Sequence, residues 1–393
     1  MTHQHNACKS LLILAAGAKG AIGSTLAASI AALRHDSGKI LPYLTTADRF
    51  PWLFPPQAVD FAGWDVADIP MTSAVRRHGV LPESAWTGRA DEIDRMPVLP
   101  APPANADMAS QADRILRDIR ALSARFPESL PVFVNLLPSC GAASPDAWRT
   151  TEDIIRHVNP VVFPDMAYAL GAVSAGIPVV NFTPNPIECA AVVQEAIKND
   201  VPIAGCDGKT GQTFFKVVLA SAFRARNLRV DGWYSLNILG NADGKNLMNP
   251  ERASGKLANK TQLLDDILGY PVGGRYGESA HKVLIDYYPP RGDAKEAWDV
   301  IDLNGIFDMP MSLRINLQGR DSILAAPLVL DLARWMAALS LSGRRGLIPE
   351  LGFYFKKPMG DSPPVTFQEQ LNCLNILEQA CNDDVFSSTG DRS

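Results

Sequence analysis

The fold of this protein is indicated near its start by the sequence LLILAAGAKGAIGSTLAASIAAL, residues 11–33. The apolar run from Leu11 to Ala16 predicts a buried strand, glycines follow it at once, and an Ala-rich helix is expected from Ser24 to Leu33. This order of strand, turn and helix opens a βαβ unit. Because the glycines come directly after the apolar run, we interpret the run as a strand and not as the core of a signal peptide.

The turn between this strand and helix carries regularly spaced glycines, Gly17, Gly20 and Gly23. Such a turn lets backbone N–H groups approach a pyrophosphate at the positive end of the helix, so it predicts dinucleotide binding. The spacing is G-x-x-G-x-x-G and not the commoner G-x-G-x-x-G, and no convincing ribose-binding acid follows about 20 residues later. The alternative is a tight turn whose small residues serve packing alone. None of the eight tyrosines has a Lys four residues later, which argues against a short-chain dehydrogenase.

Length and composition exclude several classes of protein. At 393 residues the chain can form two or three domains, and 47% hydrophobic with 20% charged residues describes a globular protein with a large core. The 37 basic and 42 acidic residues give a net charge of −5, and no Lys/Arg run reaches five residues, so nucleic acid is not an expected partner. Because no apolar run reaches about 18 residues, no membrane association is expected.

The six cysteines form no CxxC pair and have no His-rich neighbourhood. This pattern argues against a zinc site and a disulfide framework, and it favours reduced thiols in a cytoplasmic protein. We assign no metal site, because paired acids such as Asp265 and Asp266 fit a solvated helix at least as well.

The first half of the chain favours a parallel sheet. Short β-rich runs at residues 131–137 and 177–182 each follow a helical pattern, as central strands of such a sheet do. Residues 50–103 are rich in Pro and Trp and lack a sustained period, so we expect a long excursion over the edge of the sheet.

The second half changes its pattern after residue 213. A helix is expected at 216–226, and alternating strands at 230–237, 281–288 and 311–317 favour an open antiparallel sheet packed on helices. A helix at 322–341 then returns the chain to the first domain, and residues 379–393 are expected to fray.

These patterns predict an α/β fold. It consists of a doubly wound, NAD-binding Rossmann-like domain built from residues 1–213 and 325–393, with an inserted α+β domain at residues 214–324.

Two later segments carry polar groups suited to a phosphate. Residues 205–213, GCDGKTGQT, precede a helix and predict either an anion-binding loop or an N-capping turn. Lys256 and Lys260 follow at i, i+4 spacing, which in a helix puts both ammonium groups on one face. That pair predicts either phosphate binding with proton transfer or an ordinary solvated lysine face.

Five ordered blocks resemble the myo-inositol-phosphate synthase family, whose pattern runs G-D-D-x-K-S-G-Q-T, S-Y-N-x-L-G-N-N-D-G-x-N-L, S-K-x-x-x-K, Y-x-P-x-G-D-x-K and D-S-x-L-A-A-P. The matching residues are 205–213, 234–244, Lys256 with Lys260, 290–295 and 321–327. The likeness extends to residues 17–25, 181–184 and 356–358. It covers most of the chain and leaves residues 50–103 unmatched.

The resemblance implies a cyclase that converts glucose 6-phosphate to 1D-myo-inositol 3-phosphate. C5 is oxidised, the ketone enolises, C6 closes onto C1 as an aldol, and a final reduction restores the tightly bound NAD. Clustered ammonium groups suit these steps because enolisation and ring closure develop negative charge on oxygen. The resemblance also implies a catalytic and oligomerising inserted domain, a homotetramer and, in some members, a divalent or monovalent cation.

Carried over position by position, the resemblance names three groups of residues. The catalytic candidates are Lys256 as principal acid/base, Lys356, Lys260, Asp321 and Asp207. The substrate-binding candidates are Thr210, Gly211, Gln212, Thr213, Asn237 and Lys209. The cofactor-binding candidates are Gly17, Gly20, Ala21, Ile22, Gly23, Asn135, Phe182, Thr183, Asp207, Asn241, Asp243 and Asp321.

Three positions depart from the family pattern: Asp286 where many members carry Lys, Cys206 at the first Asp of G-D-D, and Ala242 at the second Asn of N-N-D. The departures leave alternatives open. One is a sister cyclase that makes a five-membered cyclitol phosphate from fructose 6-phosphate, and another is a non-catalytic NAD-binding paralogue. A third is an ordinary NAD-dependent dehydrogenase, which would accumulate NADH where a cyclase would not.

Overall fold

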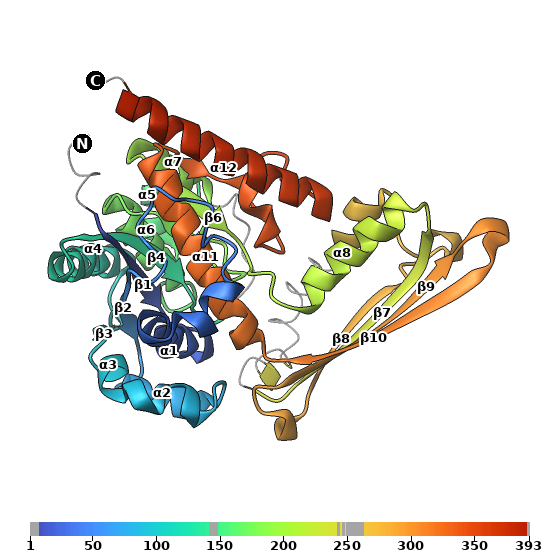
Figure 1. Cartoon of the computed structure of the whole chain (residues 1–393), viewed down its shortest axis with the longest axis horizontal. Helices are drawn as coiled ribbons and strands as arrows, with labels where there is room; N and C mark the ends of the chain where they lie inside the picture. Colours follow the sequence, from blue (N-terminus) through green and yellow to red (C-terminus); the bar gives the residue numbers. More distant parts are fainter. Residues whose placement is uncertain (1–7, 141–147, 242–243, 246–247, 249–262, 391–393) are drawn as a thin grey trace.

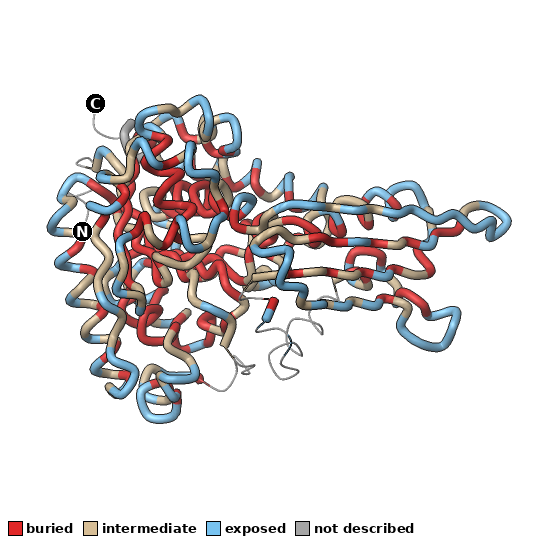
Figure 2. Tube along the Cα trace, turned by 90° about the horizontal axis from the view of Figure 1, so that it is seen from below, coloured by how far each residue is buried: buried red, intermediate tan, exposed pale blue. Residues whose placement is uncertain are grey.

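The computed structural model describes residues 8–140, 148–241, 244–245, 248 and 263–390. They form a larger domain around a seven-stranded sheet and a four-stranded sheet that projects from it as an arm (Figures 1 and 2). The strands of the larger sheet are β1 (Ser10–Ala16), β2 (Val59–Asp65), β3 (Val98–Pro100), β4 (Ser129–Asn135), β5 (Val179–Asn181), β6 (Pro202–Gly205) and β11 (Gly346–Leu347).

The larger sheet is doubly wound. Its order is β11-β6-β5-β4-β1-β2-β3, and every pairing is parallel. The first six strands therefore follow the dinucleotide-binding order 3-2-1-4-5-6, with the direction of winding reversing between β1 and β4. Ligands of such sheets bind outside the carboxyl ends of the strands at this reversal point.

Helices cover both faces of the larger sheet. Leu11, Ile13 and Ala15 of β1 pack in one core with α1 and α11, whereas Leu12 and Leu14 pack in a second core on the opposite face. The helices of this domain are α1 (Ala21–His35), α2 (Met71–His78), α3 (Ala90–Asp94), α4 (Met108–Arg125), α5 (Thr151–His157), α6 (Asp165–Ser174), α7 (Ala190–Lys198), α11 (Asp321–Leu341) and α12 (Phe367–Gly390). Burial on both faces explains why β1 reads as a continuous apolar run.

Helix α11 passes a length-and-composition test for a membrane span, but 78% of its most hydrophobic window is buried within the protein. It packs against α1 and against β1, β4, β5 and β6. Its apolar surface is therefore that of a core helix.

The smaller sheet has the order β10-β9-β7-β8. Its strands and the helix beside them are α8 (Gln212–Ala225), β7 (Arg229–Leu239), β8 (His281–Tyr287), β9 (Lys295–Asn304) and β10 (Pro310–Gly319). Val217, Ala220 and Phe223 of α8 pack on the inner face with Trp233 and Ile301. The expectation of an antiparallel sheet was wrong in one pairing, because β7 and β8 run parallel.

Two further expectations were wrong. Residues 50–103 contain β2 and β3 of the larger sheet, not only an excursion over its edge. Residues 379–390 continue helix α12 because Leu374, Leu377 and Cys381 bury one side of that helix in the core of the larger domain. Both errors come from segments whose structure depends on distant packing partners.

Candidate functional site

The glycine-rich turn between β1 and α1 has the geometry of an anion-binding turn. Gly17 has φ +83°, and a Cβ on Gly23 would lie 2.5 Å from the carbonyl oxygen of Ala18. A side chain at either position would strain or displace this backbone. Gly20 is the N-cap of α1, Ala21 and Ile22 begin the helix, and no side chain caps its first N–H groups. A pyrophosphate can therefore come close to the backbone at the start of α1, as the binding of a dinucleotide requires.

An acid that the sequence analysis missed lies beside this turn. Asp65 ends β2, and its two carboxylate oxygens accept hydrogen bonds from the backbone nitrogens of Lys19 (2.8 Å) and Ala67 (2.9 Å). Dinucleotide-binding domains place a ribose-binding acid near this point. The search about 20 residues past the glycines failed because a long connection separates α1 from β2. The sequence signal was the acidic end of the strand VDFAGWD.

Buried polar side chains gather at the ends of β4 and β5. Asn135 donates to Asp165 (2.7 Å), and the Thr183 hydroxyl donates to Asn181 (3.0 Å). Burial raises the pKa of Asp165, opposed by hydrogen bonds from Asn185 and Asn135. The side chains of Asn135 and Thr183 thus face the interior. Their predicted contacts to the cofactor would therefore be made by backbone atoms or by side-chain atoms at the margin of the cluster.

The loop after β6 brings two predicted catalytic residues together. Lys356 Nζ lies 2.8 Å from Asp207 Oδ1. The two backbones are also joined, because Lys356 N donates to Asp207 O (2.7 Å) and Cys206 N donates to Lys357 O (2.9 Å). Phe182 lies in the same corner, where its ring packs against the α carbon of Gly208. Residues far apart in sequence therefore form one ion pair at the carboxyl edge of the larger sheet.

A second ion pair links the two sheets. Lys295, the first residue of β9, lies with its Nζ 3.2 Å from Asp321 Oδ2 at the start of α11. Thr210 donates its hydroxyl hydrogen to Asp321 Oδ1 (3.0 Å). Desolvation by the protein raises the pKa of Asp321, but the charges of Lys295 and Lys356 with these hydrogen bonds outweigh it, and the pKa lies below its usual value. Asp321 is therefore ionised.

The predicted phosphate loop leads into the amino end of α8. Gly211 precedes the helix and no side chain caps it, so its first N–H groups are suited to an anion. Gln212 turns its side chain inward and donates to Asp299 (2.9 Å), while Thr213 is buried in the first turn. In this arrangement Gln212 offers a ligand its backbone N–H.

Lys209 also turns inward. Its Nζ donates to the carbonyl oxygen of Gly352 (3.1 Å) and to Gln370 (2.7 Å), and the residue is 2% exposed. Burial lowers the pKa of Lys209 to about 7. These contacts join the loop to the segment before Lys356 and to α12, so Lys209 has a structural position and its predicted substrate contact is not formed by this geometry.

A buried polar network, absent from the predictions, supports α8. Lys216 donates to Ser235 (3.1 Å) and lies 2.8 Å from His281 Nε2. Burial lowers the pKa of Lys216 to about 8, partly opposed by the charge of Asp299. Asn237, two residues beyond Ser235 on the same face of β7, is 1% exposed, and its amide has no hydrogen-bond partner among the described residues. A buried amide without partners is suited to contact a ligand.

The other predicted residues have separate positions. Asn241 donates to Asp293 (3.2 Å). Asp286 is exposed and alternates with inward-facing neighbours on β8, so it belongs to the outer face of the arm. Lys256, Lys260, Asp243 and Ala242 lie outside the described residues.

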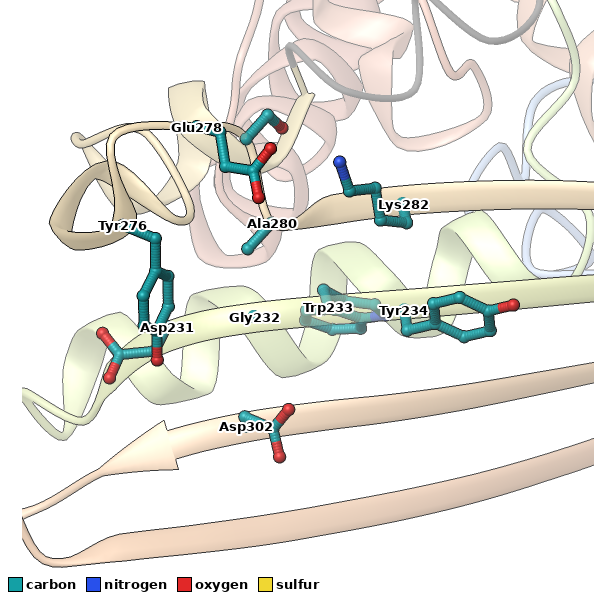
Figure 3. Close-up of a pocket in the computed structure, with 10 residues that line it drawn as sticks. Asp231, Gly232, Trp233, Tyr234, Tyr276, Glu278, Ala280, Lys282 and Asp302 are labelled. Atoms are coloured by element: carbon teal, nitrogen blue, oxygen red, sulfur yellow. The ribbon is translucent and has the colours of Figure 1, made fainter.

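A cavity of about 320 Å³ lies elsewhere, on the arm (Figure 3). It is lined by acidic and aromatic side chains that include Asp302, Glu278 and Tyr276, and by none of the predicted site residues. One lining acid, Asp231, already pairs with Arg275 at 2.5 Å. Within the described ranges no three or more His, Cys, Asp or Glu side chains are grouped for a metal ion.

The chain is similar in sequence to known proteins over most of its length. Residues 211–322 match the family model described as myo-inositol-1-phosphate synthase. The chain is 33% identical over 329 residues to inositol-3-phosphate synthase 1 of Bacteroides thetaiotaomicron, covering 77% of this chain and 75% of that protein. It is 28% identical to the Bos taurus protein of the same name, covering 91% and 71%.

Solved structures agree in fold. The inositol-3-phosphate synthase of Caenorhabditis elegans has a TM-score of 0.82 at 20% identity, with 95% of this chain and 86% of that chain covered. A myo-inositol-1-phosphate synthase-related protein of Thermotoga maritima has a TM-score of 0.71 at 21% identity, with 95% and 98% covered. Sequence and fold together show that the chain belongs to the inositol-3-phosphate synthase family, whose members are isomerases of the intramolecular lyase type.

Proposed function

We propose that this enzyme converts glucose 6-phosphate to 1D-myo-inositol 3-phosphate, with NAD bound throughout and restored in each turnover. The observation that carries the proposal is the meeting of two Lys–Asp pairs, Lys356–Asp207 and Lys295–Asp321, beside the open amino end of α8. Cations next to an anion-binding helix end suit a phosphorylated substrate that develops negative charge as it reacts.

The residues of the larger domain fit NAD. Gly17 and Gly23 leave space that a Cβ would fill, the start of α1 offers uncapped N–H groups, and Asp65 stands at the ribose position. Bound there, NAD would supply a hydride acceptor for the sugar and a hydride donor for the final reduction. Phe182, with the carboxyl ends of β4 and β5, would border its nicotinamide end.

Lys356 is suited to the proton and charge steps. Asp207 holds its ammonium group in place, and the charge of Lys356 also reaches Asp321. An ammonium group so held can stabilise the enolate oxygen that forms after oxidation at C5. The family resemblance assigns the proton transfer itself to Lys256, outside the described residues.

The test incubates the purified protein with NAD and, separately, with glucose 6-phosphate and fructose 6-phosphate. Phosphorus and carbon NMR follow cyclitol phosphate, and absorbance follows NADH. We expect inositol phosphate from glucose 6-phosphate without NADH accumulation, abolished by Lys256→Ala. A product from fructose 6-phosphate alone would replace the proposal with the five-membered sister cyclase, and accumulating NADH would replace it with a dehydrogenase. No product, despite NAD binding and added divalent or monovalent cations, would reject it.

We also propose that copies of the chain assemble, as a homotetramer in the cytoplasm, through the outer face of the arm. Tyr234, Leu284 and Trp298 are each about half exposed on this face. In this interface the outer faces of two arms would pack against each other around a two-fold axis. The axis would run perpendicular to the strands at the level of Leu236, so that Lys282 of one copy lies opposite Asp286 of the other. Such an interface gives the departure at Asp286 a role in assembly.

Light scattering on a sizing column tests the assembly. We expect a tetramer for the unmodified protein and smaller species for Trp298→Glu, which buries an unpaired charge in the interface. Exchange of both charges, Lys282→Asp with Asp286→Lys, should keep the assembly. A monomer at working concentration, or an unchanged mass for Trp298→Glu, would reject this interface.

A further inference from the structure

We propose that Glu188 is a positioning residue, whose uncharged carboxyl group holds the C-terminal end of β6 where Asp207 can orient Lys356. The inference rests on the proposed function, because that function gives the ammonium group of Lys356 its part in the reaction. Neither the family resemblance nor the comparisons assign a role to Glu188.

Glu188 packs against the last residue of β6. It is 5% exposed, and a Cβ on Gly205 would collide with its Oε1. The carboxyl group thus fills the space beside Gly205 that a side chain at that position would need. The other oxygen, Oε2, accepts a hydrogen bond from Asn181 at the end of β5 (3.0 Å). Glu188 therefore joins the ends of two neighbouring strands of the larger sheet.

A chain of hydrogen bonds leads from Glu188 to Asp207. Asn181, the donor to Glu188, accepts the hydroxyl hydrogen of Thr183 on its Oδ1 (3.0 Å). The carbonyl oxygen of Thr183 in turn accepts the backbone N–H of Asp207 (2.9 Å). Because Asp207 Oδ1 lies 2.8 Å from Lys356 Nζ, a shift of this chain would change the position of the ammonium group.

The surroundings of Glu188 favour its uncharged form. Oε1 has no hydrogen-bond partner among the described residues, and Oε2 accepts from a neutral amide. A buried carboxylate with so few donors is costly, so the group keeps its proton.

Three titratable groups act on this carboxyl group, namely Asp165, Cys206 and Lys357. Burial raises the pKa of Glu188 to about 8; the charge of Asp165 adds to the rise, and the charge of the exposed Lys357 opposes it. Burial also raises the pKa of the Cys206 thiol well above its usual value, so the thiol stays neutral while Glu188 titrates.

Ionisation of Glu188 should disturb the site. The neutral carboxyl fits beside Gly205, whereas a carboxylate needs water or a cation around it. The side chain must then move, and the contacts that position Asp207 loosen. We therefore expect activity to be lost as the pH rises above about 8.

The test compares the unmodified protein with Glu188→Gln, which has the same shape and no charge at any pH. Both are assayed with NAD and glucose 6-phosphate from pH 7 to pH 9. At pH 7, kcat of the variant should lie within about threefold of the unmodified value. With a pKa of about 8, only about one-eleventh of Glu188 is neutral at pH 9. The ratio of kcat of the variant to that of the unmodified protein should therefore rise about tenfold from pH 7 to pH 9.

Ionisations that both proteins share cancel in this ratio. The matched control is Glu195→Gln, which removes a carboxylate on the surface of α7 that pairs with Lys198. Its kcat ratio to the unmodified protein should stay constant over the same pH range.

Glu188→Ala tests the packing itself. It empties the space beside Gly205, so it should lower kcat about tenfold at pH 7 and change KM by less than about threefold. The proposal is overturned if Glu188→Gln lowers kcat more than tenfold at pH 7, or if its kcat ratio does not change with pH. If Glu188→Ala does not fold, the pH dependence of Glu188→Gln decides the question.

Two measurements without sugar separate this proposal from the proposed function. Infrared difference spectra between pH 7 and pH 9 should show the loss of a protonated carboxyl band that Glu188→Gln lacks. Crystal structures of the NAD-loaded proteins should show the contact between Lys356 and Asp207 in the unmodified protein and its loss in Glu188→Ala. If no product forms from glucose 6-phosphate, these results still apply, and a missing band or an unchanged contact would overturn the role of Glu188.

Discussion

The two sheets of this protein differ in how many of their faces are covered. In the larger sheet six of the seven residues of β1 are buried, because helices pack on both faces. In the arm, exposed residues alternate with less exposed ones along β8, because α8 covers one face of the sheet. The first arrangement encloses a core, and the second leaves one face of the sheet uncovered.

The difference shows where chemistry can be placed. Neither core contains the predicted catalytic groups. The two Lys–Asp pairs lie at the boundary between the two regions. Their residues are Asp207 in the loop after β6, Lys356 between β11 and α12, Lys295 at the start of β9 and Asp321 at the start of α11. A rigid sheet on one side and an arm on the other can hold cofactor and substrate between them.

The largest effect is expected from a substitution at the boundary between the two regions. Lys356→Met should lower kcat about 10²- to 10⁴-fold, because the ammonium group that Asp207 orients would no longer stabilise charge in the transition state. NAD binding and the melting temperature should change little. Steady-state kinetics with a thermal melt measure this, and activity within tenfold of the unmodified protein would remove Lys356 from the mechanism.

The next largest effect is expected on the free energy of unfolding, when a glycine in each sheet is replaced. A Cβ on Gly63 of β2 would lie 2.1 Å from the backbone oxygen of Ala15, whereas a Cβ on Gly232 of β7 would meet nothing closer than 3.6 Å. Gly63→Ala should destabilise the protein by about 2–4 kcal/mol, and Gly232→Ala should stay within about 1 kcal/mol. Urea unfolding measures both. Equal effects would show that the two sheets pack alike near these glycines.

A smaller effect should depend on pH. Burial lowers the pKa of Lys216 from 10.5 to about 8. Below pH 8 the lysine is protonated in both states, but between pH 8 and 10.5 the unfolded chain keeps a proton that the folded chain has lost. The stability contributed by this group therefore rises with pH in that window. Lys216→Met should reduce the rise, as melting temperatures from pH 7 to 10 would show. An identical pH slope in both proteins would contradict the buried position.

The smallest effect should come from the surface of the larger domain. Lys198 pairs with Glu195 at 3.3 Å, but its side chain is 72% exposed. Lys198→Met should change the free energy of unfolding by less than about 0.5 kcal/mol. A change above 1 kcal/mol in urea unfolding would mean that this surface contributes more than exposure implies.

Much of the larger domain could be predicted from the local sequence pattern. The strand at Leu11–Ala16, the glycines after it and the strands near residues 131 and 177 appear in the structure close to their expected bounds. These segments carry their signal locally, because a strand buried on both faces must be apolar throughout. β9 was missed, since its run KEAWDVIDLN mixes charged and apolar residues on the two faces of the arm.

Less of the candidate site could be predicted from the sequence. Family motifs named Asp207, Asp321 and Lys356, but their pairing, and the partner Lys295, could not be read from sequence separation. The inward turn of Lys209 was also hidden, because its partner Gln370 lies 161 residues later in the chain, on helix α12. Motifs specify which side chains are present, whereas contacts over such separations depend on how the elements pack.

Local pattern thus sufficed for the fold class and the glycine-rich turn, because the hydrophobic period and the glycine spacing are properties of short segments, and the resemblance of short motifs sufficed for the family. The packing of distant segments determined the position of Asp65 beside the turn, the two Lys–Asp pairs and the outward direction of Asp286. The physical reason is that a side chain's charge acts through space, over a few ångströms, on neighbours that the order of residues does not reveal.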